Sequence, residues 1–407
     1  MTCRHCLSPL SLKFLDLGHA PPSNAYLTAE GLRRAEATFP LRLFVCATCR
    51  LVQTEDYADA DALFSPDYAY FSSTSRSWLD HAARYATMIV ARLGLGLESH
   101  VIELASNDGY LLRNFVAAGI PCMGIEPTDS TAEAAEAIGV PTLRRFFGQG
   151  LGYELATTGQ AADLVIGNNV FAHVPDINDF TAGIAAVLKP EGVVTLEFPH
   201  LMRLIEHCQF DTVYHEHFSY LSLGSAQRIF AGAGLRIFDV EELPTHGGSL
   251  RIYGCHAAAG HARTPQVAAV LDQERRHGLL DDAVYAGFQA RANAVKNGLL
   301  SFLLQVWGDG KTIAAYGAAA KGNTILNFAG IRPDLLPFVC DAAPSKQGRF
   351  LPGSHIPILP PTALMENRPD YVLILPWNIA DEVRTQLAPL AALGTRFVTV
   401  VPELAIL

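Results

Sequence analysis

The sequence predicts an α/β protein with a short cysteine-rich N-terminal module followed by two Rossmann-like domains. Four cysteines form two Cys-x-x-Cys pairs within the first 49 residues. Strand-like apolar runs alternate with helical stretches between residues 101 and 198, and again between 312 and 401. This alternation is typical of mostly parallel sheets with ligands at the carboxyl ends of the strands. The 407 residues exceed what one hydrophobic core usually holds, so several domains are expected.

Composition excludes some classes of function. The net charge of −10 argues against general nucleic-acid binding, which needs basic patches. No apolar run reaches the roughly eighteen residues of a membrane span, and the start Met-Thr-Cys-Arg-His-Cys is no signal segment. We therefore expect a cytoplasmic protein with no nucleic-acid or membrane partner, and a monomer as the default.

The two cysteine pairs, Cys3 with Cys6 and Cys46 with Cys49, predict a tetrahedral zinc site. Four protein ligands close such a site, so the metal would serve folding rather than catalysis. Four unrelated reduced thiols are the alternative, and a redox Cys-x-x-Cys is disfavoured because no thioredoxin-like βαβ unit surrounds it. The remaining cysteines stand in apolar contexts that predict buried thiols: Cys122, Cys208, Cys255 and Cys340.

A strand, a loop of small residues and a helix are predicted at Val101–Leu104, Ala105–Gly109 and Tyr110–Ala118. Backbone N–H groups in such a first turn face a nucleotide-like ligand. The loop is not Gly-x-Gly-x-x-Gly, which disfavours a dinucleotide. The next predicted strand ends at Glu126, where an acid can bind both hydroxyls of a ribose. Further elements are expected as a helix at 77–93, a strand at 163–169, a helix at 177–188 and a strand at 193–198.

The run Tyr214-His-Glu-His217 gathers side chains that hold or move protons. If it is extended, Tyr214 and Glu216 point one way, and His215 and His217 the other. A neutral imidazole is a good general base near pH 7, and a phenol can hydrogen-bond a developing enolate oxygen. A polar surface loop with solvated histidines is the alternative.

The C-terminal third repeats the strand–loop–helix form. Pro244–Arg251 is predicted to be a turn entering a strand, where the double glycine suits either close approach to a ligand or a hairpin. The loop Gly317–Asn323 lacks a Walker ending, and it is either a backbone nest with Lys321 for a diphosphate or an ordinary turn. Phe328 and Trp377 suit stacking on a base, although aromatic residues near strand ends are more often core.

Taken together, the motifs resemble the sugar C-methyltransferases that act on nucleotide-linked 4-keto-deoxyhexoses and use S-adenosylmethionine (SAM). The usual glycine-rich cofactor turn of class I methyltransferases is altered here to Glu-Leu-Ala-Ser-Asn-Asp-Gly, which points to this particular family. The matching features cover nearly the full length. They are the two Cys-x-x-Cys pairs, Tyr68-x-Tyr-x-Ser-Ser-x-Ser75, Glu103-x-x-x-Asn-Asp-Gly-Tyr-Leu111, Asn168-Asn-Val-Phe-Ala-His-Val-Pro175, Tyr214-x-Glu-His217 and Tyr316-Gly-x-x-x-Lys-Gly322.

The resemblance implies a zinc-binding module at 1–65, a class I methyltransferase domain at 66–235 and a C-terminal nucleotide-sugar-binding Rossmann-like domain at 236–407. It implies methylation of C3 through an enolate. The implied catalytic residues are His217, Tyr214, Glu216 and His173. The implied SAM residues are Tyr68, Ser75, Glu103, Asn107, Asp108, Gly109, Glu126, Pro127 and Asn168. The implied substrate residues are His246, Arg251, Tyr316, Lys321 and Asn323.

His215 replaces a residue that is often acidic in this family, and we assign it no role. Two other classes of function remain open at this point. An O- or N-methyltransferase would need no acidic C–H bond in its substrate. A non-enzymatic binding or scaffold protein would keep a degenerate cofactor fold and would fail to bind SAM.

Overall fold

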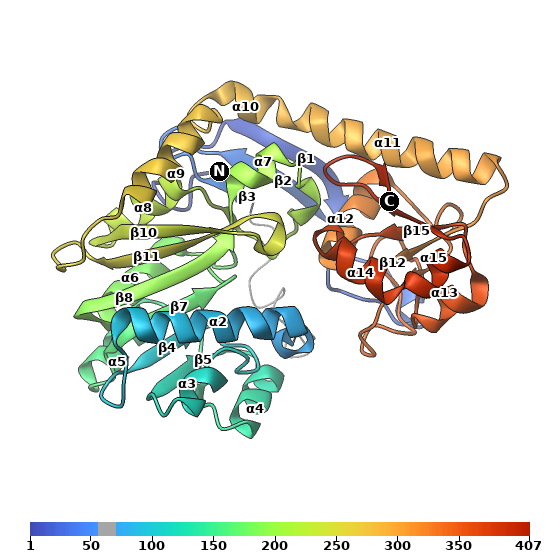
Figure 1. The fold of residues 1–407 in the computed structure, drawn as a ribbon. Helices are drawn as coiled ribbons and strands as arrows, with labels where there is room; N and C mark the ends of the chain where they lie inside the picture. Colours follow the sequence, from blue (N-terminus) through green and yellow to red (C-terminus); the bar gives the residue numbers. More distant parts are fainter. Residues whose placement is uncertain (56–70) are drawn as a thin grey trace.

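Three β-sheets organise the chain in the computed structural model, which describes residues 1–55 and 71–407 (Figure 1). The predicted cofactor residue Tyr68 lies outside the described residues. The N-terminal sheet has the strand order β1-β2-β3-β9 and is antiparallel. Its strands are β1 (Leu12–Ala20), β2 (Phe39–Val45), β3 (Val52–Thr54) and β9 (Ser219–Tyr220). The N-terminal module therefore takes one strand from the segment that follows His217.

The central sheet has seven strands in the order β10-β11-β8-β7-β4-β5-β6. Five are parallel, and β11 and β10 add an antiparallel edge. Its middle strands β4 and β7 are mostly apolar, with Glu103, Asp163 and Asn168 as the polar exceptions, and all of their residues except Asp163 are buried because helices cover both faces. Its strands are β4 (Val101–Leu104), β5 (Cys122–Ile125), β6 (Thr142–Leu143), β7 (Ala162–Asn168), β8 (Leu188–Pro199), β10 (Leu235–Leu243) and β11 (Ser249–His256).

The helices of this region begin and end close to the predicted positions. The helix predicted at Tyr110–Ala118 starts later, because residues 110–112 form turns before α3. The α-helices are α2 (Arg76–Leu93), α3 (Arg113–Ala117), α4 (Asp129–Ala137), α5 (Gln149–Thr157), α6 (Ile177–Val187), α7 (Leu201–Glu206), α8 (Leu223–Gly232) and α9 (Pro265–Arg276). The 3₁₀ helices are η1 (Gly31–Arg33), η2 (Ser72–Thr74), η3 (Phe210–Thr212), η4 (Thr245–Gly247) and η5 (Trp377–Ile379).

The predicted domain boundary at 235/236 falls at the first residue of a strand that belongs to the central sheet. Strand β10 begins at Leu235 and pairs with β11, which in turn pairs with β8 from Ser249 to Cys255. Leu250 and Ile252 on β11 are completely buried in the central core. Because these two strands bury their apolar side chains against the central sheet, the central domain extends at least to His256.

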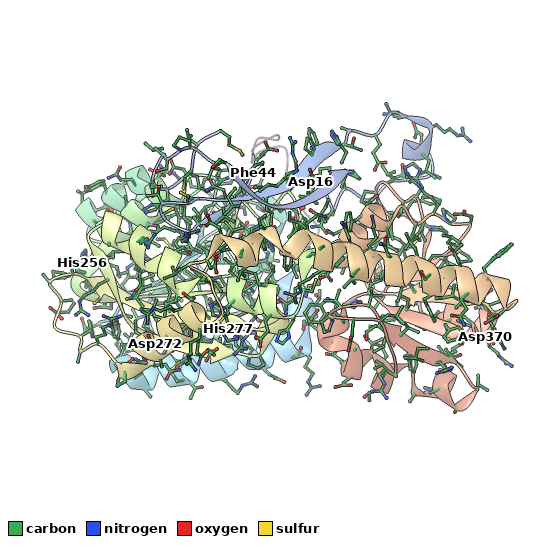
Figure 2. All side chains as sticks on the ribbon, turned by 90° about the horizontal axis from the view of Figure 1, so that it is seen from above. Asp16, Phe44, His256, Asp272, His277 and Asp370 are labelled. Atoms are coloured by element: carbon green, nitrogen blue, oxygen red, sulfur yellow. The ribbon has the colours of Figure 1, made fainter. Side chains whose placement is uncertain are left out.

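The C-terminal sheet has the order β14-β13-β12-β15-β16-β17 and is parallel except for β17. A long helix, α11, connects it to the rest of the molecule (Figure 1). Figure 2 shows α11 running lengthwise toward Asp370. The strands are β12 (Ile313–Tyr316), β13 (Val339–Cys340), β14 (Ile358–Leu359), β15 (Tyr371–Ile374), β16 (Arg396–Thr399) and β17 (Ala405–Ile406). The helices are α10 (Asp282–Ala286), α11 (Phe288–Gly308), α12 (Ala320–Ala329), α13 (Thr362–Asn367), α14 (Ala380–Gln386) and α15 (Ala388–Ala392).

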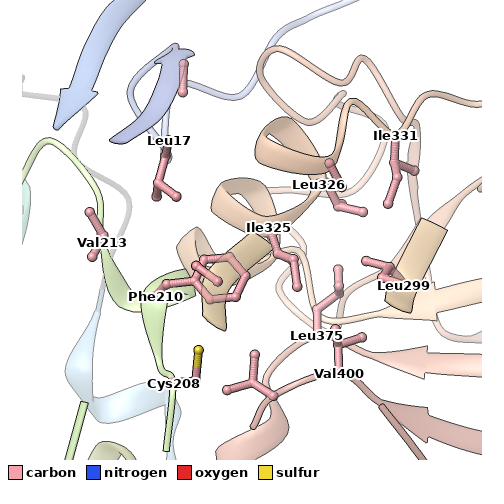
Figure 3. Packing of buried hydrophobic residues seen from close by; sticks show 14 of the residues in the cluster. Leu17, Cys208, Phe210, Val213, Leu299, Ile325, Leu326, Ile331, Leu375 and Val400 are labelled. Atoms are coloured by element: carbon pink, nitrogen blue, oxygen red, sulfur yellow. The ribbon is translucent and has the colours of Figure 1, made fainter. Parts of the chain in front are cut away.

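One apolar cluster joins the N-terminal module, the segment before Tyr214 and the C-terminal domain (Figure 3). Leu17 comes from β1, Phe210 from η3, and Ile325 and Leu326 from α12. Phe328 packs its ring edge-on against Phe210 with centroids 5.6 Å apart, so this aromatic residue is core. The shared cluster holds the three parts together around the cavity described next. Within the described ranges, the longest and most apolar helices fall short of a membrane-spanning segment.

Candidate active site

A cavity of about 650 Å³ lies between the carboxyl edge of the central sheet and the C-terminal domain. Residues from all three parts of the molecule line it. The predicted site residues in its lining are Asn107, Glu126, Pro127, Asn168, His173, Tyr214, Glu216, His217, His246 and Lys321. The fold therefore brings together ten side chains that lie as much as 214 positions apart, from 107 to 321.

The segment Tyr214–His217 is a turn, so the alternation of side chains that an extended run would give does not apply. The backbone N–H of His217 donates to the carbonyl of Tyr214 at 3.0 Å. The chain must reverse here, because η3 ends at Thr212 and the N–H of Phe218 already bonds the carbonyl of Ala172 at 2.8 Å. The turn places the centroids of the Tyr214 and His217 rings 4.0 Å apart, whereas an extended strand would point the two side chains to opposite sides.

His217 is held as a neutral base. Its Nδ1 lies 3.1 Å from the carbonyl oxygen of Thr212, which can only accept, so Nδ1 carries the hydrogen. Nε2 is therefore the basic nitrogen. Burial, followed by the neighbouring His173, His246 and Lys321, holds the pKa of His217 well below its usual range. The side chain is thus unprotonated at neutral pH and able to accept a proton.

His173 and His215 have different surroundings. The His173 ring follows β7 and lies 4.5 Å from the His217 ring. Burial lowers the pKa of His173 to about 4, so it too is neutral at pH 7. His215 points away to the N-terminal module, where Nε2 contacts the carbonyl of Phe39 at 3.3 Å. His215 does not belong to the cavity lining.

Glu216 contacts a residue that the sequence did not single out. The amide nitrogen of Asn24 donates to both carboxylate oxygens of Glu216, at 3.1 and 2.9 Å. Burial raises the pKa of Glu216 to about 7, and the Asn24 hydrogen bond opposes that rise. Asn24 sits in a turn 192 positions away in the sequence, and no local pattern marks it. The other lining residues absent from the prediction include Trp78, Asn169, Lys346 and Asn378.

The acidic end of the cavity is formed by the first turn of the central sheet. Glu126 accepts from the backbone N–H groups of Asn107 at 3.0 Å and Thr128 at 2.9 Å. Asn107 adopts a left-handed backbone, with φ of 51°. Gly109 is also left-handed, and an added Cβ would lie 3.0 Å from Val140, so this position requires glycine.

The predicted cofactor residues outside the lining support this turn. Asp108 accepts from the N–H of Ser73 at 3.0 Å, and Ser75 caps α2 by accepting from the N–H of Trp78. Glu103 is buried beneath the turn, where burial and the neighbouring Glu126 and Asp108 raise its pKa well above the usual range.

These residues fit SAM. Among the described residues, Glu103 Oε2 and the Asn168 amide have no hydrogen-bond partner although they are buried. Buried polar atoms normally have partners, so such atoms indicate a missing ligand. The Glu126 carboxylate suits ribose hydroxyls, and the unpartnered oxygen of the buried Glu103 carboxyl and the Asn168 amide suit further polar groups of S-adenosylmethionine.

The basic end of the cavity is formed by the first turn of the C-terminal domain. Lys321 Nζ donates to Asn378 Oδ1 at 2.8 Å and lies 4.6 Å from the centroid of the Trp377 ring. Burial lowers the pKa of Lys321 to about 8, and Asp211 opposes this. Lys346 adds a second cation, with Nζ 2.9 Å from the carbonyl of Ala318.

The other predicted substrate residues are divided. His246 lines the cavity, has a left-handed backbone with φ of 55°, and contacts the Asn169 amide at 3.1 Å. Three residues lie outside the lining and have partners elsewhere. Arg251 donates to Glu197 at 2.7 Å, Tyr316 to Gln386 at 2.9 Å, and Asn323 to the carbonyl of Ser23 at 2.5 Å.

The four cysteines of the N-terminal module form one cluster. All four Sγ atoms lie within 4.8 Å of one another, with Cys3 to Cys49 at 3.5 Å and Cys6 to Cys46 at 3.4 Å. A tetrahedron with Zn–S bonds of about 2.3 Å places its sulfurs about 3.8 Å apart, so the cluster fits zinc. The four remaining cysteines are buried, which confirms that prediction: Cys122, Cys208, Cys255 and Cys340.

Comparison with known proteins finds matches to three family models. Residues 3–64 match a putative zinc-binding domain, 78–240 a methyltransferase domain and 244–402 a C-methyltransferase C-terminal domain. The chain is 36% identical to "C-methyltransferase NovU" of Streptomyces niveus, over 98% of this chain and 95% of that one. It is 30% identical to an uncharacterized methyltransferase of Mycobacterium leprae over 24% of this chain and 36% of that one.

Solved structures give lower similarity. A putative methyltransferase in complex with the Trm112 activator of Haloferax volcanii covers 50% of this chain and 99% of its own, with 16% identity and a TM-score of 0.37. The magnesium protoporphyrin IX methyltransferase of Synechocystis with bound SAM covers 50% and 100%, with 15% identity and a TM-score of 0.35. On the near full-length match and the three domain matches, the chain belongs to the SAM-dependent C-methyltransferase family that carries an N-terminal zinc-binding domain and a C-methyltransferase C-terminal domain.

Proposed function

We propose that this enzyme methylates C3 of a nucleotide-linked 4-keto-deoxyhexose through an enolate. The observation that carries the proposal is the hydrogen bond between His217 and the Thr212 carbonyl, which makes Nε2 a base. This base lines a cavity whose acidic end fits SAM and whose basic end suits a diphosphate. Methylation of carbon requires a base that removes a proton from an acidic C–H bond. The alternative, an O- or N-methyltransferase, does not need an acidic C–H bond in its substrate.

The C4 ketone makes the C3 proton acidic, because removal of that proton gives an enolate. His217 removes the proton, and Tyr214 and His173 hydrogen-bond the enolate oxygen. General-base help contributes about 10²–10⁴-fold to the rate. Loss of one donor to the oxyanion costs about 10²–10³-fold. Glu216 accepts a hydrogen bond from a sugar hydroxyl. Among the described residues, Asn24 holds its carboxylate by two hydrogen-bond contacts.

SAM supplies an electrophilic methyl group on a sulfonium, and this chain positions the cofactor. In the proposal Glu126 binds the ribose and Glu103 and Asn168 bind polar groups of the cofactor. The other proposed SAM residues are Tyr68, Ser75, Asn107, Asp108, Gly109 and Pro127. The nucleotide sugar is bound by Lys321 and His246. Three further residues support the walls of its site: Arg251, Tyr316 and Asn323. A single chain carries all of these groups, so the proposed active unit is a monomer. We propose the cytoplasm as its location.

The test uses purified protein, SAM and a panel of nucleotide-linked 4-keto-6-deoxy sugars in D₂O, with mass spectrometry of the sugar nucleotide. We expect one methyl group to be gained on carbon, together with exchange of a substrate proton. His217→Ala is expected to lose both, by about 10²–10⁴-fold, while still binding SAM. An unchanged His217→Ala enzyme would contradict the assignment of the base. Methyl gain on oxygen or nitrogen without exchange would favour the alternative class.

A further inference from the structure

We propose that Asn24, which the N-terminal module extends into the active site, is a positioning residue that keeps the Glu216 carboxylate aimed into the cavity and ionised. The catalytic meaning of this inference rests on the proposed function. The effect of Asn24 on Glu216 itself does not, and it can be measured on the protein without a sugar substrate.

The contact between the two residues is direct. Asn24 Nδ2 lies 3.1 and 2.9 Å from the two oxygens of Glu216, and both residues line the cavity. Glu216 is only 2% exposed, so few waters can replace this donor. A hydrogen bond to an ionised acceptor is about twice as strong as one between neutral groups. Asn24 therefore favours the ionised form of Glu216 and restricts its orientation.

Asn24 is itself held on both sides by the C-terminal domain. Asn323 donates to the carbonyl of Ser23 at 2.5 Å, and the hydroxyl of Tyr26 donates to the carbonyl of Ala318 at 2.6 Å. The next residue, Leu27, exchanges two backbone hydrogen bonds with Phe350, at 2.9 and 2.8 Å. Asn24 thus occupies an anchored segment and can transmit the position of the C-terminal domain to Glu216.

The electrostatic setting makes one hydrogen bond decisive. Burial raises the pKa of Glu216 to about 7, and the Asn24 donor is the opposing influence. The titratable groups around it are Tyr26, whose pKa Glu216 raises, and His173, which bonds the Glu216 backbone. Lys346 and Asp341 lie beyond Tyr26. Because Glu216 titrates near neutral pH, a shift of one pKa unit changes how much of the enzyme carries the charge.

The experiment follows the carboxyl band of Glu216 by infrared difference spectroscopy during a pH titration of the full-length, zinc-loaded protein. Glu216→Gln identifies the band, because that variant lacks the titrating carboxyl. In Asn24→Ala we expect the pKa of the band to rise by about one unit, because the ionised form loses a charge-assisted donor. Asn24→Asp is expected to raise it further, since a second carboxylate beside Glu216 disfavours its ionisation.

The matched control is Glu36→Gln. Glu36 belongs to the same contact between the N-terminal module and the C-terminal domain, where it accepts from the Gly353 N–H and contacts His355, both at 2.9 Å. This variant is expected to leave the Glu216 titration unchanged. An unmoved Glu216 band in Asn24→Ala, or an equal shift in Glu36→Gln, would overturn the inference. Failure of sugar methylation with the expected band shift would instead refute only the proposed function.

Discussion

In both Rossmann-like units, an acid that follows the second strand accepts one backbone hydrogen bond from the first turn and one from the residue two positions after the acid. In the central unit Glu126 accepts from Asn107 N–H at 3.0 Å and Thr128 N–H at 2.9 Å. In the C-terminal unit Asp341 accepts from Ala318 N–H at 2.7 Å and Ala343 N–H at 2.8 Å. The two units thus build the same frame from unrelated sequences.

The charge that each frame presents to the cavity is opposite. Glu126 lines the cavity, whereas Asp341 does not, and the C-terminal frame presents Lys321 and Lys346 instead. Lys346 also lies 3.5 Å from Asp341 and offsets its charge. The comparison teaches that the strand–loop–helix geometry creates a ligand site, while a few side chains determine the charge of the ligand.

Removal of the zinc ligands should have the largest effect, because the N-terminal module contacts both units. Arg4, between two cysteine ligands, donates to the carbonyl of Pro175 at 2.6 Å, and Leu27 pairs with Phe350 of the C-terminal unit. We expect Cys46→Ser to release zinc and to destabilise the protein by several kcal/mol. Methyl transfer should fall because ligand binding is weakened at both ends of the cavity. Metal content and thermal unfolding measure this. Stoichiometric zinc with unchanged stability would contradict the structural role.

At the acidic end, Glu126→Ala should weaken SAM binding by about 100-fold, because hydrogen bonds to a charged group are lost. Calorimetric titration with SAM measures the affinity. Glu133→Ala is the matched control: this exposed acid on α4 lies 3.5 Å from Arg144 and belongs to no part of the cavity lining. The comparison between the two units would fail if Glu126→Ala weakened binding of the nucleotide sugar as strongly as that of SAM.

At the basic end, Lys321→Ala should raise the KM for the nucleotide sugar by about tenfold and leave the SAM affinity unchanged. The effect should shrink at high salt, since an anionic ligand is screened. Lys311→Ala removes an exposed lysine that pairs with Asp370 at 2.9 Å and serves as the control. Equal losses of SAM and sugar binding in Lys321→Ala would show that the two ends do not divide the ligands as proposed.

The two units also differ in how much the sequence could predict. The strands, the helices and Glu126 follow from local hydrophobic pattern and from the position of an acid after a strand. Whether a side chain faces the cavity depends on contacts that no local pattern contains. Arg251 forms an ion pair with Glu197 and lies over the ring of Tyr85, and the strand that carries it joins the central sheet. Asn24 reaches Glu216 only because the N-terminal module packs on the C-terminal domain.

The turn at Tyr214–His217 shows the same limit on a smaller scale. The residue types predicted proton chemistry, and the structure holds His217 neutral, but a role as a base stays a prediction. Their relative orientation differs from that of an extended run, because the hydrogen bond of Phe218 to Ala172 and the pairing of β9 with β3 impose a reversal. Long-range pairing therefore determines the geometry of this turn, which the alternation of side chains along the sequence could not predict.

The smallest expected effect concerns the pH dependence of kcat/KM, in which each end of the cavity should determine one limb. Glu216 has a pKa raised from 4.5 to about 7, so it becomes ionised only as the pH rises through 7. Lys321 has a pKa lowered from 10.5 to about 8, so it loses its charge as the pH rises through 8. His217 contributes neither limb, because it stays neutral over this range. We therefore expect kcat/KM to be bell-shaped, with limbs near pH 7 and 8.

Single variants assign each limb to its region. Glu216→Gln should remove the acid limb and keep the alkaline one, whereas Lys321→Ala should remove the alkaline limb and keep the acid one. Folding stability provides an independent check of the sign for Glu216. A carboxyl that binds its proton more tightly in the folded state stabilises the fold at low pH, and this contribution is lost as the pH rises from about 4.5 to 7. Glu216→Gln should therefore flatten that part of the stability profile by about 3 kcal/mol. If both variants moved the same limb, the acidic and basic ends would be one coupled site rather than two.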